Sequence, residues 1–196
     1  ACVALALYPI NFHNLFFLFV FCLVLAAFET QIEGEAGWAA NLPTWKPSPS
    51  KLISRLYGKI MGGRELTLYH ILVFTLVFIF LHYPYFASKS WSFSSELTTL
   101  SFFFLVIVIW DFLWFVVNPR YDFRRFWGEH VLWHKKWFLH MPVDYWFALI
   151  ISALLYTRFS LGWTLLREWI EIVVLFIVLT VIVIIFAISV GIFNIR

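Results

Sequence analysis

The residues best suited to chemistry in this sequence are carboxylates and histidines at the ends of apolar segments. Glu29 and Glu33 follow the first apolar segment and are four residues apart, so a continuing helix would place them on one face. His70 lies about one helical turn inside the second segment. Asp111 stands alone near the end of the third, in SFFFLVIVIWDFLWFVV. We expect these side chains to lie at one depth on one side of a membrane.

The loop after Asp111 adds an HxxxH pair, His130 and His134, whose spacing puts both rings on one face of a helix. Carboxylates and imidazoles together are typical ligands of zinc, iron or manganese. A divalent metal could make a nucleophile of bound water at the membrane surface. We therefore predict catalytic carboxylates and metal ligands among the following residues: Asp111 and Glu33 as catalytic, and Glu29, His70, His130 and His134 as ligands.

Each of these signals also has a structural interpretation. An HxxxH pair arises easily by chance in a Trp-rich loop, and glutamates can simply end a helix in water. Asp111 has no charged neighbour in sequence, and a buried carboxylate needs a partner. We expect that partner to be His70, Arg120 or Arg124, although a helix–helix hydrogen bond would also satisfy it. The shared depth of the group favours a functional site.

Composition identifies the elements that must position these groups. The chain has 196 residues, of which 63% are hydrophobic and 13% charged, whereas a soluble domain has roughly 25% charged residues. Such a chain belongs in a bilayer. Its net charge of +3 gives no indication of a nucleic-acid partner. Cys2 and Cys22 form no CxxC motif, and we expect them to be small buried hydrophobes.

A membrane-spanning helix needs about 20 mostly apolar residues, and about five segments qualify on that criterion. They cover approximately residues 12–28, 66–86, 97–117, 143–159 and 169–193. The predicted fold is all-α, a polytopic integral membrane bundle forming a single membrane domain over residues 1–196. Residues 1–28 lack the basic n-region of a secretory signal, so we assign them to the mature membrane domain.

Charge in the loops predicts the orientation of the chain. The segments 29–65 and 118–142 are rich in Lys and Arg, and two predicted spans separate them, so they share a side. The positive-inside rule places both in the cytoplasm. The predicted location is therefore the cytoplasmic membrane, with the N-terminus outside and the C-terminus inside.

Residues 50–61 (SKLISRLYGKIM) predict a basic amphipathic helix lying at the cytoplasmic membrane surface. Ser50 can cap it, and it has basic and apolar faces. Three arginines in the second loop could also bind lipid phosphate. The predicted partners are the bilayer and anionic headgroups, bound by Lys51, Arg55, Lys59, Arg120, Arg124 and Arg125. The alternatives are a short helix packed on the loops and ordinary positive-inside anchoring.

The loop sequences GWAANLPTW and EHVLWHKKW carry a resemblance to a known group of proteins. With the neighbouring DFLWFVVNP, they look similar to small, uncharacterised polytopic membrane proteins of bacteria. The resemblance covers about residues 29–146 and implies a polytopic membrane fold without implying any activity.

Two functions from different classes fit these observations. The first is a metal-dependent enzyme acting on a lipid or isoprenoid-type substrate at the cytoplasmic leaflet. The second is a non-catalytic subunit or assembly factor with membrane protein partners. A transporter fits less well because no inverted repeat is visible. Haem ligation is not signalled by any His spacing, and the six histidines are too few for the histidine boxes of membrane desaturases.

Overall fold

The computed structural model describes residues 12–61, 63–87, 90–127, 131, 133–160 and 162–193. His130 and both chain ends, including the predicted positions of the two termini, lie outside these residues. The regular secondary structure of the described residues is helical apart from one hairpin of two short strands. The predicted all-α membrane bundle is confirmed to this extent.

Four helices within the described residues are long and apolar enough to cross a membrane: α1 (Phe12–Glu33), α3 (Leu68–Ala87), α4 (Phe93–Val117) and α7 (Trp163–Ser189). Their ranges match four of the predicted spans, but α1 runs past residue 28 to Glu33. Glu29 and Glu33 therefore belong to the helix itself. The chain is a multi-pass membrane protein on this evidence.

The predicted span 143–159 is shorter than expected. Helix α6 (Val143–Tyr156) has 14 residues, or about 21 Å at 1.5 Å per residue. The hydrocarbon core is about 30 Å thick. Helix α6 is therefore a shorter apolar helix than the four long candidates. It runs along α4 from Asp144, which His134 links to Asp111, to the start of α4, where Arg158 donates to Ser94.

Helix α4 is the centre of the bundle and contacts α1, α3, α6 and α7. It begins in a capping box in which Ser92 accepts the backbone N–H of Ser95 and the Ser95 hydroxyl accepts the N–H of Ser92. Ser101 on α4 and Ser152 on α6 bond reciprocally, with their hydroxyl oxygens 2.9 Å apart. The indole of Trp169 on α7 also donates to Ser152 at 3.0 Å. These bonds join three helices in an apolar region, where unpaired polar groups are costly.

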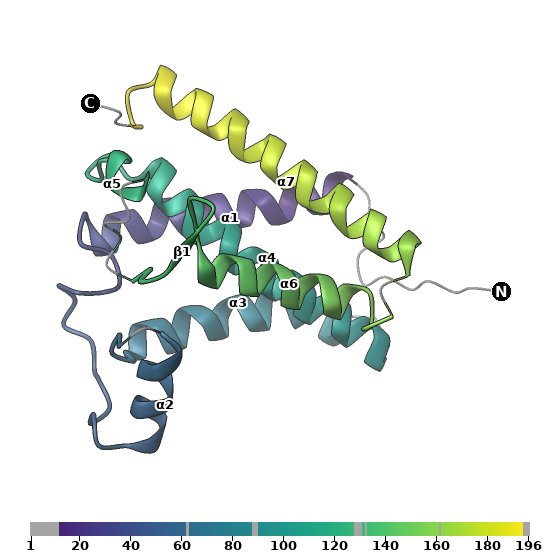
Figure 1. Cartoon of the computed structure of the whole chain (residues 1–196), viewed down its shortest axis with the longest axis horizontal. Helices are drawn as coiled ribbons and strands as arrows, with labels where there is room; N and C mark the ends of the chain where they lie inside the picture. Colours follow the sequence, from purple (N-terminus) through teal and green to yellow (C-terminus); the bar gives the residue numbers. More distant parts are fainter. Residues whose placement is uncertain are drawn as a thin grey trace.

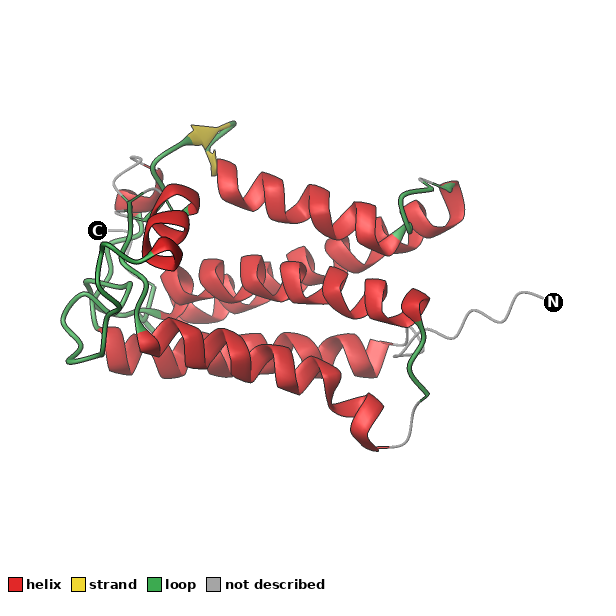
Figure 2. Ribbon diagram, turned by 90° about the horizontal axis from the view of Figure 1, so that it is seen from below, coloured by secondary structure: helices red, strands yellow, loops and turns green. Residues whose placement is uncertain are grey.

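Two connecting segments and a hairpin gather at one end of the bundle, where α1 and α4 end and α3 begins (Figures 1 and 2). We call this the loop-bearing end; it holds segment 34–51, α5 (Arg124–Trp127) and the hairpin β1 (Trp137–Phe138) and β2 (Met141–Pro142). The Asn118 amide donates to the Gly34 carbonyl at 2.7 Å. The two predicted basic loops therefore share one side, as expected from their charge.

The predicted amphipathic helix exists as α2 (Leu52–Ile60), set off from the bundle at the loop-bearing end (Figure 1). The prediction that Ser50 caps it is wrong: Lys51 is the N-cap residue and makes no side-chain cap bond. The Ser50 hydroxyl instead pairs with that of Ser48 at 2.8 Å. Leu52 and Ile53 remain 64% and 59% exposed, so this part of the apolar face is not covered by the rest of the described chain.

Candidate functional site

Asp111 lies in the last two turns of α4 and accepts hydrogen bonds from three side chains. Its Oδ1 accepts from the Trp133 indole at 3.2 Å, and its Oδ2 accepts from His134 Nε2 at 2.9 Å and from the Tyr145 hydroxyl. The predicted partners His70, Arg120 and Arg124 were therefore wrong. The actual partners lie 22 to 34 residues away in sequence, so only the fold of the loop could bring them to Asp111.

His134 bridges two carboxylates. Its Nε2 faces Asp111, and its Nδ1 lies 2.7 Å from Asp144 Oδ2. Each ring nitrogen must carry a proton to donate to a carboxylate, so this arrangement holds His134 as an imidazolium. Its side chain is only 3% exposed, whereas that of Asp144 is 53% exposed. We call Asp111, His134 and Asp144 the acid–imidazole triad.

The charge state of His134 follows from two opposing effects. Burial disfavours the charged ring and works to lower its pKa. The negative charges of Asp111 and Asp144, together with the hydrogen bonds they accept, outweigh burial and raise the pKa of His134 to about 9. The His134 ring is therefore positively charged near neutral pH.

Sequence reasoning identified two members of this triad and missed the third. Asp144 and Tyr145 stand in the first turn of α6, directly after Pro142. A carboxylate in the first turn of a helix is common because it complements the helix dipole, so Asp144 gave no distinctive functional signal. The feature that could have identified Asp144 is its position at the start of an apolar helix, at the same end of the bundle as Asp111.

The two glutamates of α1 take different partners from the triad. Glu29 accepts from the Tyr69 hydroxyl on α3 at 2.8 Å. Glu33 is buried and accepts the backbone N–H of Ala39 at 2.6 Å. That bond closes a turn in which Trp38 and Ala39 have φ angles of 50° and 49°, a conformation that side chains normally disfavour. Glu33 therefore secures the loop after α1.

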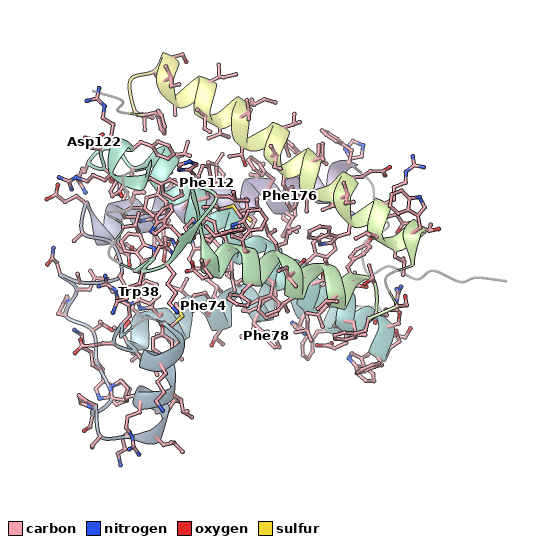
Figure 3. The ribbon with its side chains drawn as sticks, in the orientation of Figure 1. Trp38, Phe74, Phe78, Phe112, Asp122 and Phe176 are labelled. Carbon is pink, nitrogen blue, oxygen red and sulfur yellow. The ribbon has the colours of Figure 1, made fainter. Side chains whose placement is uncertain are left out.

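His70 is held apart from His134. Its Nδ1 pairs with the Thr67 hydroxyl at 2.7 Å, and its ring lies 4.4 Å from that of Trp38. Phe74, one turn further along α3, continues this aromatic contact (Figure 3). The predicted ligands Glu29, His70 and His134 are thus occupied by separate neighbours.

No group of three His, Cys, Asp or Glu side chains among the described residues could hold a metal ion. The physical reason is visible at each residue, because both nitrogens of His134 and the Nδ1 of His70 already face other side chains. His130 lies outside the described residues, so a zinc, iron or manganese centre that includes it stays a prediction.

Aromatic rings cover the triad and fix the loop above it. The Trp133 ring packs 5.4 Å from both Trp114 and Phe115 on α4. Gly37, at a φ of 60°, lies so close to the Trp133 ring that an added Cβ would collide with it. This position requires glycine for both its backbone conformation and its space. The loop after α1 and the loop after α4 therefore form one packed aromatic layer.

The predicted lipid-binding cations are all exposed. The side chains belong to α2, to its N-cap residue and to the segment after α4, at the same end of the bundle as the triad: Lys51, Arg55, Lys59, Arg120, Arg124 and Arg125. An apolar bundle with a cationic, Trp-rich end is typical of a protein that meets phospholipid headgroups there.

The fold and this site define the chain as a small polytopic membrane protein with an acid–imidazole triad, centred on a buried histidine, at its loop-bearing end. No protein-family model, curated protein or solved structure matches the sequence. The interpretation of the site therefore depends on its own geometry.

Proposed function

We propose that this protein is a membrane enzyme that acts on a lipid or isoprenoid-type substrate at the cytoplasmic leaflet. The observation that carries the proposal is the triad, in which a half-exposed carboxylate, Asp144, is held by a buried imidazolium that Asp111 anchors in turn. A general base needs both access to a substrate and a fixed orientation. Asp144 has both.

The residues of the triad would take distinct roles in such a reaction. Asp144 would accept a proton from the substrate or from a water molecule. His134 is a positioning residue because its ring is 3% exposed and both nitrogens face carboxylates. Asp111 would fix the ring and offset its charge, as its three donors keep the carboxylate in place.

The substrate class follows from the surroundings of the triad. The exposed arginines after α4 can bind phosphate oxygens bidentately, and the lysines of α2 attract anionic headgroups. Their density on one end also supports the proposed orientation, with the loop-bearing end in the cytoplasm. A substrate with an anionic head and an apolar tail would meet both the cations and the bundle surface.

The test is lipid conversion by protein reconstituted in vesicles of bacterial total lipid with added polyprenyl phosphate, followed by mass spectrometry. Asp144→Asn should reduce conversion by about 100-fold or more, the usual contribution of a general base. Asp122→Asn is the matched control, because the Asp122 carboxylate lies at the same end but accepts the backbone N–H of Arg124 in its own loop. Absence of conversion by the wild-type protein, or full activity of Asp144→Asn, would refute the proposal.

The alternative function is a non-catalytic subunit or assembly factor of a larger membrane complex. The outer face of α7 favours it, since this face is a long apolar stripe that includes Val174, Ile177, Val181 and Ile185, each more than 45% exposed. A partner helix could cover it as well as lipid can. Purification in mild detergent tests this function: a co-purifying stoichiometric protein supports it, and a protein that purifies alone argues against it.

A further inference from the structure

A groove of about 490 Å³ lies between the β-hairpin and the start of α6, in the size range of ligand sites. Lys136 and Trp137 line it from the hairpin side, and Trp146, Phe147 and Ile150 line it from α6. None of these residues belongs to the triad or to the predicted lipid-binding set. The groove is therefore a separate feature of the loop-bearing end.

The hairpin that forms one wall is tightly built. Leu139 and His140, its two turn residues, have φ angles of 50° and 59°, as a two-residue turn between antiparallel strands favours. Phe138 pairs with Met141 across the strands, and the N–H of Val143 donates to the Lys136 carbonyl at 2.9 Å. The hairpin is thereby fixed directly onto the first residue of α6.

The two tryptophans of the groove offer their rings rather than their N–H groups. The Trp137 indole donates to the His134 carbonyl at 2.9 Å, and the Trp146 indole donates to the Phe138 carbonyl at 3.0 Å. With both donors used by backbone, the rings act as rigid apolar walls. Tryptophan in this role is typical of the boundary between headgroups and hydrocarbon.

The ends of the groove differ in chemistry. At one end Lys136 is exposed, and it has no carboxylate partner among the described residues. At the other, Phe147 and Ile150 are 62% and 53% exposed and continue along one face of α6. The nearby Asp144 carboxylate faces the positive His134 ring, which offsets its repulsion of an anion.

We propose that this groove binds one anionic phospholipid, with its phosphate at Lys136 and an acyl chain between the tryptophan rings and along Phe147 and Ile150. The charge at one end and the apolar stripe leading away from it match the two parts of such a lipid. The inference does not depend on the proposed reaction, because binding here needs no chemistry at the triad.

The experiment is lipid titration of the purified full chain in detergent, with native mass spectrometry counting bound phosphatidylglycerol and phosphatidylcholine. Lys136→Gln should weaken binding of one phosphatidylglycerol about fivefold, since a surface lysine contributes about 1 kcal/mol to anionic lipid binding. Binding of phosphatidylcholine should stay unchanged. Lys135→Gln is the matched control: it removes the same charge from the adjacent residue, which lies near Gly63 rather than in the groove.

A second measurement locates the acyl chain. Phosphatidylglycerol with a photoreactive acyl chain should label the peptide containing Phe147 and Ile150, and Ile150→Trp should reduce that labelling by filling the groove. Glycerol 1-phosphate should not compete, because it lacks the chain. If Lys135→Gln and Lys136→Gln weaken phosphatidylglycerol binding equally, or if Ile150→Trp leaves the labelling unchanged, the proposed lipid site is overturned. Neither result would bear on lipid conversion by Asp144. Loss of conversion with intact groove binding would overturn only the reaction.

Discussion

Deprotonating His134 should destabilise the folded protein, and the size of the effect follows from the triad. The folded-state pKa of about 9 lies above the ordinary value of 6.5. Each pKa unit corresponds to about 1.4 kcal/mol, so the triad contributes at most about 3 kcal/mol, with the half-exposed Asp144 lowering that figure through solvent screening. Because the folded pKa is raised, this stability is fully present below pH 6.5 and is lost as the pH rises through 9.

The measurement is the free energy of unfolding in mixed micelles, obtained by dodecyl sulfate titration and circular dichroism at several pH values. The wild-type protein should lose up to about 3 kcal/mol between pH 6 and pH 10. His134→Gln can still donate one hydrogen bond but cannot hold the charge. It should therefore be less stable at pH 6, and the loss above pH 6.5 attributable to the triad should disappear.

His140→Asn is the matched control for this series. His140 is an exposed histidine on the same hairpin, and Asn tolerates its positive φ angle. This variant should keep the wild-type pH dependence. If the wild-type stability is flat between pH 6 and pH 10, or if His134→Gln keeps the full decline, the assignment of a charged His134 between two carboxylates is refuted.

Three further predictions concern packing and topology. Gly37→Ala should destabilise the protein by about 2–5 kcal/mol, because the added methyl group overpacks the site and the φ angle is positive. Gly191→Ala is the control, since Gly191 also has a positive φ but no atom lies within 4 Å of the added Cβ, and it should cost only about 1–2 kcal/mol. Thermal unfolding of the two variants compares these costs. Ser152→Ala should cost about 1–2 kcal/mol by removing interhelical hydrogen bonds, and a loss below the error of the dodecyl sulfate titration would contradict the structural role of these bonds. In a cysteine-free background, Ser48→Cys should react with an impermeant maleimide only from the cytoplasmic side, and Ser90→Cys only from the opposite side; the reverse pattern would invert the proposed orientation.

The sequence predicted the helices well because their signal is local. A run of apolar residues long enough to cross hydrocarbon has few other places to fold, and α1, α3, α4 and α7 appear where the runs occur. The ends of the helices were less predictable. Helix α1 continues to Glu33 because Tyr69 and the backbone of Ala39 satisfy its last carboxylates, and those partners lie beyond the apolar run.

The site was predicted in part. The charge pattern correctly gathered Glu29, Glu33, His70, Asp111 and His134 at one end, since alternating spans force alternate loops to one side. The pairing among them could not be read from the chain, because it depends on which way each loop folds back. His134 turned toward Asp111 and Asp144, while His70 packed against Trp38.

The sequence by itself determined that this protein is embedded in a bilayer, because its composition is strongly apolar. It also determined that the cationic residues collect at one end, because two spans separate the two basic loops. Only the tertiary structure decided that Asp111 accepts hydrogen bonds from His134, Trp133 and Tyr145 rather than from an arginine. The reason is geometric: a carboxylate pairs with the donors that the folded loop and α6 bring within about 3 Å, and the separation of residues along the sequence does not predict which donors come that close.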